Sequence, residues 1–579
     1  MPSAATSAAT RCRRRAVAVR RAMARSWRAM GPARQLVAAV AATSAVLATC
    51  VYLLRPAVSA ADADVAAVVR VAKKAGASTA TEATAAAMSS RAGEVSPFDV
   101  TALTDTYPPP EDLAAFATAA VRYLVRASQP DGTFVYEVRV APNGQVSRPR
   151  GYNTLRHAGA IYALGDACLG RGGLPARSCV GANETMARAC EWLLRVAVRS
   201  VPGGEADAGV PLLGVWSKPR VELGDLSRPE EELGDVRLGG LGLGLVALTT
   251  CARLDSPAIA AATDGDAVAG GVPAAVVDGL TATLMLRMQK PDGGFFSYMD
   301  AAGVPNDHRV SLYYPGEAVL GLLMAYALRG NARLLVAAVR GLEALAASRA
   351  DMKPADFPCD HWTLIATAVL FRTPAFRVVW EHGRRPRRKR AAVLLAAARS
   401  LTTSCYERDV RRTPRSTGSP CSLATGLEGT FAMLPLLARV AGYDPAGAPT
   451  AMDEELLHNG YCLGQRTVGE LVASQVRGLP PGSATATSAA AAATEAAAKS
   501  VAGALPGRVD LTPVDPDKAG NARRVVSGSD GVYRVDTTQH SLSAVLAYVR
   551  AGGRGGGGHL RGMACSGQGA GHRGGGGSR

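Results

Sequence analysis

Acidic residues are absent from the start of this chain: no aspartate or glutamate precedes Asp62. This absence leaves nine arginines unopposed in front of an uncharged, mostly apolar run from Leu36 to Leu54. A run of that length is just long enough to cross the hydrocarbon core of a bilayer as a helix, and an arginine excess before such a helix favours a cytoplasmic N-terminus. We therefore predict an arginine-rich leader over residues 1–35, a transmembrane helix over 36–54, and a lumenal or external C-terminal domain, as in a single-pass membrane protein of the secretory pathway.

The same leader supports a second interpretation, because segments rich in Ala, Ser and Arg and poor in acids also direct proteins to organelles. The small residues Val58-Ser59-Ala60 would suit cleavage of a transit peptide or a secretory signal. Localisation in a plastid or another organelle through a cleaved transit peptide therefore stays open beside the membrane anchor.

Outside the leader the chain has little excess charge. Lys and Arg exceed Asp and Glu by 17 in the whole sequence, and ten of that excess lie in residues 1–61. A mildly basic body lacks the electrostatic footprint of a nucleic-acid-binding domain. We therefore predict no nucleic-acid partner, and we expect the N-terminal helix to bind the membrane.

Cysteine motifs for metal or redox chemistry are also lacking. The eleven cysteines include no CxxC pair and no Cys/His cluster with zinc-ligand spacing. We predict no metal site and no cofactor. We interpret the cysteines as scattered buried thiols, with a disulfide such as Cys359–Cys405 as the alternative in an oxidising lumen.

Apolar residues recur at helical spacing along most of the chain, and long alternating strands are scarce. Several segments are apolar nearly all round, which is typical of helices that are buried on both sides. The pattern predicts helices over residues 111–127, 154–167, 184–200, 239–253, 273–289, 314–329, 332–349, 361–372, 390–403, 422–441, 466–477 and 538–550.

Helices in six sequential pairs predict an all-α fold, an (α/α)6 toroid of six helical hairpins, behind the N-terminal transmembrane or targeting segment. In such a toroid the loops at one end of the inner ring line a cleft. The other expected segments are an Ala/Thr-rich stalk over 55–107, the toroid over 108–477, a disordered insertion over 478–531, the last toroid helix over 532–551, and a disordered Gly/Arg-rich tail over 552–579.

One short motif occurs twice, each time after a predicted helix. The segments Gln129 to Phe134 and Gln289 to Phe295 both contain Pro-Asp-Gly followed by an aromatic residue. Asp-Gly is typical of a tight turn, because glycine adopts backbone angles that other residues avoid. We interpret the motif first as a helix-to-loop turn, while a functional interpretation places Asp131 and Asp292 at the mouth of the cleft.

Polar residues also gather at the starts of helices that are otherwise apolar. Tyr152, Asn153, Arg156 and His157 stand together at one such start. The arginine fork can bind a carboxylate or sugar hydroxyls, and the histidine is a candidate proton carrier. The structural alternative is a capping network at the N-terminus of the helix.

Tyrosines and an acid occur together at another helix start. Tyr313 and Tyr314 precede Glu317, which lies in the first predicted turn. The helix dipole favours an acid there, but two aromatic rings beside a carboxylate also suit a sugar. Later helices carry isolated polar residues in the same way, namely His361, Glu428 and His540.

Three strings, Tyr152 to Gly159, Tyr313 to Ala318 and Gln539 to Ala544, resemble those of toroidal proteins of the six-hairpin glycosidase type. The resemblance covers residues 110–477 and 525–550. It implies a toroid and sugar-processing relatives, including glycosidases and sugar epimerases, and it transfers no catalytic role to an individual residue.

We therefore predict a membrane-anchored carbohydrate-active protein that hydrolyses or epimerises a glycan or a small sugar with paired carboxylates. Glu317 and Asp292 are the candidate catalytic carboxylates, and His157 and His361 are the candidate proton carriers. The candidate sugar-binding residues are Tyr152, Asn153, Arg156, Tyr313, Tyr314, Asp131, Glu428 and His540.

Two other classes of protein stay open. The repeated Asp-Gly turns resemble those of terpenoid cyclases and prenyltransferases, but the chain has no DxDD or DDxxD motif and only 5% aromatic residues, few for a cavity that must stabilise carbocations. The other class is a non-catalytic scaffold or glycan-binding protein that keeps the toroid as a binding surface.

Overall fold

A computed structural model describes most of the chain between residues 110 and 552. The predicted leader, transmembrane helix and stalk, and the tail after Gly552, lie outside the described residues. The described residues are 110–141, 145–149, 152–170, 173–206, 210–217, 234–254, 267–268, 272–353, 356–383, 385–407, 417–441, 451–475, 501–506, 509–514, 523–529 and 531–552.

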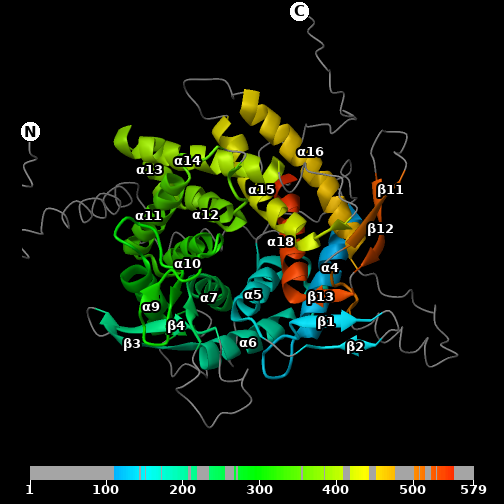
Figure 1. Ribbon diagram of the computed structural model, residues 1–579, viewed down its shortest axis with the longest axis horizontal. Coiled ribbons are helices and arrows are strands. Elements are labelled where there is room, and N and C mark those ends of the chain that lie inside the picture. The colour runs from blue at the N-terminus through cyan, green and yellow to red at the C-terminus, as the bar shows by residue number, and fades with distance from the viewer. Residues whose placement is uncertain are drawn as a thin grey trace, which may run out of the picture. The chain divides into compact units, whose positions relative to one another are not determined.

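Six helices in the described part of the chain form a closed inner ring (Figure 1). Each packs against the next in chain order, and the last packs against the first. In that order they are α5 (Thr154–Cys168), α7 (Leu238–Cys251), α10 (Tyr314–Arg329), α12 (His361–Arg372), α15 (Pro420–Ala441) and α18 (Val535–Gly552).

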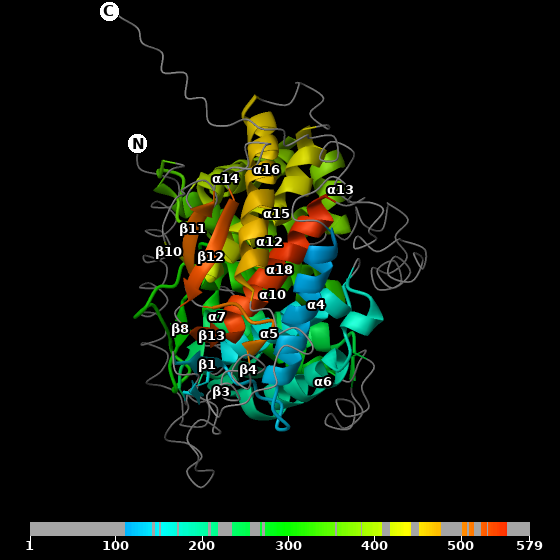
Figure 2. The ribbon, with the colours of Figure 1, turned by 90° about the vertical axis from the view of Figure 1, so that its right-hand side faces the viewer.

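Six further helices lie outside this ring, each in contact with the inner helix that follows it in the chain. The described residues therefore form six helical hairpins, as predicted. The first and last of these helices along the chain, α4 and α18, lie side by side, which closes the ring (Figure 2). The outer helices are α4 (Pro110–Ala127), α6 (Ala182–Trp192), α9 (Ala274–Thr283), α11 (Ala332–Ser348), α14 (Arg385–Cys405) and α16 (Ala451–Ser474).

The sequence explains which helices are inside. All residues of α7 are buried, in keeping with its almost wholly apolar sequence. Its glycines let α10 approach closely: a Cβ on Gly242 would overlap the backbone of Glu317, and one on Gly321 would lie 2.6 Å from the Gly242 carbonyl oxygen. This crossing fixes the start of α10 against α7.

Short strands connect the helices without forming a central sheet in the described residues. The sheets are β13-β1-β2, β5-β8-β9, β10-β11-β12, β3-β4 and β6-β7, and in the first of them Glu137 lies opposite Arg534. The strands are β1 (Glu137–Val140), β2 (Val146–Ser147), β3 (Val198–Ala206), β4 (Val210–Val215), β5 (Val236–Arg237), β6 (Ala267–Val268), β7 (Val272–Pro273), β8 (Tyr298–Met299), β9 (Pro305–Asn306), β10 (Thr417–Gly418), β11 (Val509–Val514), β12 (Arg523–Ser529) and β13 (Val532–Arg534).

The helices differ from the predicted spans in several places. The predicted helix 184–200 ends before strand β3, which begins at Val198. An additional helix, α13 (Pro374–His382), stands between α12 and α14, and α14 begins at Arg385 rather than at 390. Helix α16 begins at Ala451 rather than at 466, although Gly464 argues against a helix. Its glycine is needed for packing, because a Cβ there would come within 2.5 Å of the Phe431 ring.

Part of the segment 478–531, predicted to be disordered, has defined structure. Strands β11 and β12 pair with each other, and β11 also pairs with β10. Ala504 and Leu505 are fully buried, and the Leu505 amide donates a hydrogen bond to the Thr538 hydroxyl at 3.2 Å. Composition alone missed these contacts because their partners lie far away in the sequence.

Among the described residues, three disulfides join six of the cysteines that we expected to be free thiols. They join Cys168 to Cys179, Cys190 to Cys251, and Cys359 to Cys405. The last is the pairing considered as the alternative. It links Cys359, which directly precedes the N-cap residue Asp360 of α12, to Cys405, the last residue of α14. Sequence spacing could not assign these pairs, because each depends on how separate segments pack.

One helix among the described residues, Pro420–Val440, is long and apolar enough to cross a membrane. It is most of α15, which packs against α12, α14, α16 and α18, and 67% of its apolar window is buried. We interpret it as a core helix of the ring.

Candidate active site

The N-terminal halves of the inner helices bring polar side chains together inside the ring. Arg156 comes from α5, Glu317 from α10, His361 from α12, Glu428 from α15 and His540 from α18. The two histidines and both acids are buried. Five residues from distant parts of the sequence thus form one group, which we call the central cluster.

The core of the central cluster is a carboxylate between two imidazoles. Glu428 Oε2 lies 2.8 Å from His540 Nδ1 and 3.6 Å from His361 Nε2. The two imidazole rings meet edge to face, with 5.3 Å between their centroids. One carboxylate oxygen is therefore in contact with both histidines.

The neighbours of His540 determine its tautomer. Arg156 Nη1 lies 3.2 Å from His540 Nε2, and a guanidinium can only donate. Nε2 must therefore carry the lone pair, and Nδ1–H donates to Glu428. Burial raises the pKa of Glu428, and contact with His540 opposes this rise.

His361 is a neutral base that makes no hydrogen bond. Burial lowers its pKa well below the ordinary value, and His540 and Arg156 lower it further. Neither ring nitrogen has a hydrogen-bond partner among the described residues. Such an unsatisfied buried group is costly unless a ligand pairs with it.

Glu317 is a second buried acid, 4% exposed, in the first turn of α10. Burial raises its pKa to about 8; Arg156 opposes the shift and Asp360 adds to it. Its Oε2 has no hydrogen-bond partner among the residues that the structure describes. At neutral pH Glu317 is therefore mainly a neutral acid that can donate a hydrogen bond.

Asp360 holds the start of α12 and so positions His361. Its carboxylate accepts hydrogen bonds from the backbone amide of Thr363 at 3.1 Å and the Thr363 hydroxyl at 2.6 Å. Arg349 donates a third at 2.7 Å. The sequence places Asp360 beside His361 but gives no sign of the buried Arg349 that pairs with it.

Asp536 lies at the outer edge of the cluster and is shared by three groups. Its carboxylate is 3.4 Å from Arg156 Nε, 3.6 Å from Arg534 Nε and 3.4 Å from the Tyr136 hydroxyl. Tyr136, Arg534 and Asp536 were not candidates from the sequence. Only the pairing of β1 with β13 brings them beside Arg156.

Aromatic rings surround His361. The Tyr313 ring is 5.2 Å from it and the Trp362 ring 4.9 Å, measured between centroids. Tyr313 is 39% exposed, so it borders the open side of the cluster. Tyr314 points elsewhere, towards Tyr298, with 5.9 Å between the rings.

His157 does not fit the predicted role of proton carrier. It is buried, its Nε2 lies 2.9 Å from the Ala189 carbonyl oxygen, and its Nδ1 contacts the Tyr152 hydroxyl. Burial lowers its pKa to about 4. Its ring packs against Trp192 at 4.5 Å, so His157 and Tyr152 join α5 to α6. Asn153 caps α5 by accepting hydrogen bonds from two backbone amides, the structural alternative considered above.

The two Asp-Gly motifs are turns, and their aspartates stabilise them. Asp131 accepts hydrogen bonds from the amide and hydroxyl of Thr133, at 2.9 and 2.6 Å, while Asp292 accepts one from the Gly294 amide at 2.9 Å. Asp292 is exposed and its turn packs against α11. In the structure Asp292 therefore stabilises its own turn and is not one of the residues that the inner helices bring together.

His361, Glu428 and His540 are also the group with metal-ligand chemistry among the described residues, with donor atoms within 4.8 Å of one another. A metal on His540 Nδ1 would require a hydrogen on Nε2, which would then face the Arg156 donor. A cation would also lie close to the guanidinium charge. The arrangement is therefore better suited to proton transfer than to holding a metal ion.

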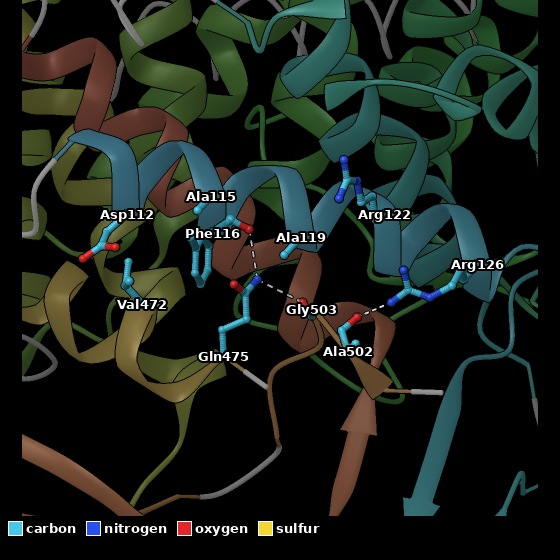
Figure 3. A pocket seen from close by; sticks show the side chains of 10 residues that line it. All are labelled: Asp112, Ala115, Phe116, Ala119, Arg122, Arg126, Val472, Gln475, Ala502 and Gly503. Atoms are coloured by element: carbon cyan, nitrogen blue, oxygen red, sulfur yellow. Dashed lines mark hydrogen bonds between the residues drawn. The ribbon is translucent and has the colours of Figure 1, made fainter. Parts of the chain in front are cut away.

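A cavity of about 410 Å³ lies on the outside of the ring, between α4 and the end of α16 (Figure 3). Gln475 spans it, donating to the carbonyl oxygens of Phe116 and Gly503, each at 3.0 Å. Arg126 donates to the Ala502 carbonyl oxygen at the other end. These contacts tie segment 501–506 to α4, and none of the lining residues belongs to the central cluster.

No protein-family model matches the sequence, and no curated protein matches it. Among solved structures, the chain is similar to a D-mannose isomerase, with 11% identity and a TM-score of 0.42 over 79% of this chain and 100% of that one. It is also similar to a cellobiose 2-epimerase from Bacillus thermoamylovorans B4167, with 10% identity and a TM-score of 0.43 over 76% and 98% of the two chains. A third similar structure is a sugar epimerase from a ruminal bacterium, with 9% identity and a TM-score of 0.40 over 74% of this chain and 95% of that one. TM-scores this low carry no argument about activity, which must come from the geometry of the central cluster.

Proposed function

We propose that the protein is a sugar epimerase or isomerase in which His361 and His540 move a proton at a carbon next to the substrate's carbonyl group. The observation that carries this proposal is the pair of buried imidazoles on either side of Glu428. Inverting such a carbon, or moving the carbonyl to the next carbon, needs a base that removes one proton and an acid that returns one. A histidine that starts neutral supplies the base, and a histidine that holds the extra proton supplies the acid.

In the proposed reaction His361 takes the proton and the C–H electrons move onto the carbonyl oxygen, which gives an enol or enolate. Arg156 and the neutral acid of Glu317 are the donors placed to stabilise charge on that oxygen. The His361 imidazolium then returns this proton to the neighbouring carbon, which completes an isomerisation. Inversion of the same carbon needs a proton from the opposite face, and His540 can give it only after it has taken up a proton on Nε2. In the reverse direction of that inversion the two histidines exchange roles.

Glu428 acts as a positioning residue in this scheme. By accepting the Nδ1 proton of His540 it fixes the tautomer and directs Nε2 towards Arg156. Arg156, whose side chain is 33% exposed, thus contacts the imidazole at the nitrogen that Glu428 does not bind. This is the logic by which a carboxylate orients a catalytic histidine in other enzymes.

Hydrolysis with paired carboxylates is less well supported by the geometry. It needs two acids that flank one glycosidic bond. Glu428 is engaged by both histidines, and Asp292 stabilises its own turn. Among the described acids of the central cluster, Glu317 is then the one left to act, and the cluster offers no second carboxylate as nucleophile or base.

A sugar is the substrate class that suits the walls of the cluster. The exposed Tyr313 ring beside His361 offers a face on which a sugar can stack, and Arg156 and Glu317 offer donors for its hydroxyls. We also retain, as a proposal, that the toroid is lumenal or external behind a membrane helix. The three disulfides support an oxidising compartment.

The test is proton exchange catalysed by the full-length protein. It is incubated in D₂O with a panel of aldoses, ketoses and reducing disaccharides, and proton NMR follows deuterium entering the carbon beside the carbonyl. We expect His361→Asn and His540→Asn each to slow exchange by at least ~100-fold. His382→Asn, which removes an exposed histidine on α13, should leave the rate unchanged.

Exchange that survives in both histidine variants would overturn the proposal. So would cleavage of a glycosidic bond without exchange, if Glu317→Gln abolishes it, because that result would identify a hydrolase.

A further inference from the structure

Two arginines share one carboxylate at the open side of the central cluster. Arg156 and Arg534 are 33% and 35% exposed, whereas Asp536 between them is only 5% exposed. The Nε atom of Arg156 lies 3.4 Å from Asp536, and that of Arg534 lies 3.6 Å from it. We call these two guanidinium groups the arginine pair.

The arginine pair carries a net positive charge. Asp536 can balance one guanidinium but not both. Glu137, opposite Arg534 on the neighbouring strand, is already paired with Arg139 at 2.6 Å. Burial raises the pKa of Glu317 to about 8, so this acid adds little negative charge at neutral pH.

The arginine pair has donors beyond those used on Asp536, and Arg156 also contacts His540, a residue that the proposed function places against the substrate. One N–H of Arg156 is used on His540 and another faces Asp536. A guanidinium has five N–H donors in a rigid fork, so more than half of them are left for a ligand. Forks of this kind bind planar anions, carboxylates above all, through paired hydrogen bonds.

We propose that the substrate is an acidic sugar whose carboxylate binds between Arg156 and Arg534. The inference rests on the proposed function and names the substrate class of the same site. Arg156 also contacts His540, so the carboxylate would belong to the sugar residue on which the proton moves. Arg534 is a binding residue in this scheme and takes no part in the proton transfer.

The test compares matched acidic and neutral sugars on the full-length protein. D-glucuronate and D-galacturonate are titrated beside D-glucose and D-galactose, and the dissociation constants are measured by calorimetry. We expect the uronates to bind at least ~10-fold more tightly, and Arg534→Gln to remove that advantage. Arg139→Gln removes the same charge from the adjacent strand, where Glu137 already pairs with it, and should change neither constant.

Equal binding of uronates and neutral sugars would overturn the inference. Equal weakening of uronate binding by Arg534→Gln and Arg139→Gln would do the same, because it would indicate a general charge effect.

The failure of the proposed function would give different results. If uronates bind through Arg534 but no substrate exchanges its proton, the binding site stands without the reaction. If neutral sugars exchange and Arg534→Gln has no effect, the reaction stands without the acidic substrate.

Discussion

Glu317 shows at the scale of one residue how burial sets chemistry. The sequence predicted Glu317 as a catalytic carboxylate in the first turn of a helix, where the helix dipole also favours an ionised acid. In the structure, burial outweighs the dipole and the nearby Arg156, and the pKa rises to about 8. The folded protein therefore keeps a proton that the unfolded chain has already released at pH 7.

This shift makes stability depend on pH with a definite sign. The contribution of Glu317 is fully present below the unfolded pKa of 4.5 and is lost as pH rises through the folded value of about 8. Glu317→Gln should remove that loss and flatten the dependence between pH 5 and 9, by up to roughly 4 kcal/mol at the alkaline end. Urea unfolding of both proteins across this range measures the difference.

An exposed acid serves as the control for this prediction. Glu184→Gln on α6 makes the same chemical change at the surface and should leave the pH dependence as it is in the wild type. If the wild type and Glu317→Gln have parallel stability curves, the acid is ionised in the folded protein and cannot be the neutral donor that we propose.

At the scale of elements, the crossing of α7 and α10 holds Glu317 in place. A Cβ on Gly242 would overlap the Glu317 backbone, so Gly242→Ala must push α10 away. We expect a loss of about 1–3 kcal/mol in the free energy of unfolding, together with reduced activity. Gly240→Ala on the same helix is the matched control, because the nearest atom to its Cβ would be 3.4 Å away.

Thermal unfolding of the two variants separates packing from helix propensity. Alanine favours a helix over glycine by about 1 kcal/mol at either position. Gly240→Ala should therefore be neutral or stabilising, while Gly242→Ala lowers the melting temperature. Equal stability of the two variants would show that the α7–α10 crossing is not tight.

At the scale of the whole molecule, the topology that we propose for the chain can be tested directly. The leader predicts that the chain after residue 54 leaves the cytosol, and six cysteines are paired as oxidising conditions allow. In sealed vesicles that carry the full-length protein in its native orientation, we expect the toroid to resist added protease. The same protease should digest it once detergent opens the membrane and reductant breaks the disulfides. Digestion of the toroid in intact vesicles would rule out this topology.

The sequence by itself determined the helices and much of the central cluster. Apolar periodicity is local, and it placed twelve helices close to where they are observed, with α13 missed and α16 too short. Polar residues near the starts of apolar helices, and an isolated acid within another helix, made Arg156, Glu317, His361, Glu428 and His540 candidate site residues. Strands β11 and β12 were missed because their pairing partners are distant in the chain.

Only the tertiary structure decided what each polar residue does. His157 and His361 both start inner helices, yet one has both nitrogens in contact with Tyr152 and Ala189 and the other has no hydrogen bond among the described residues. Hydrogen-bond satisfaction depends on neighbours from other helices, which spacing along one helix cannot reveal. For the same reason Arg534 and Asp536 became visible only when β13 paired with β1, because the ring brings together residues that the sequence keeps almost 400 positions apart.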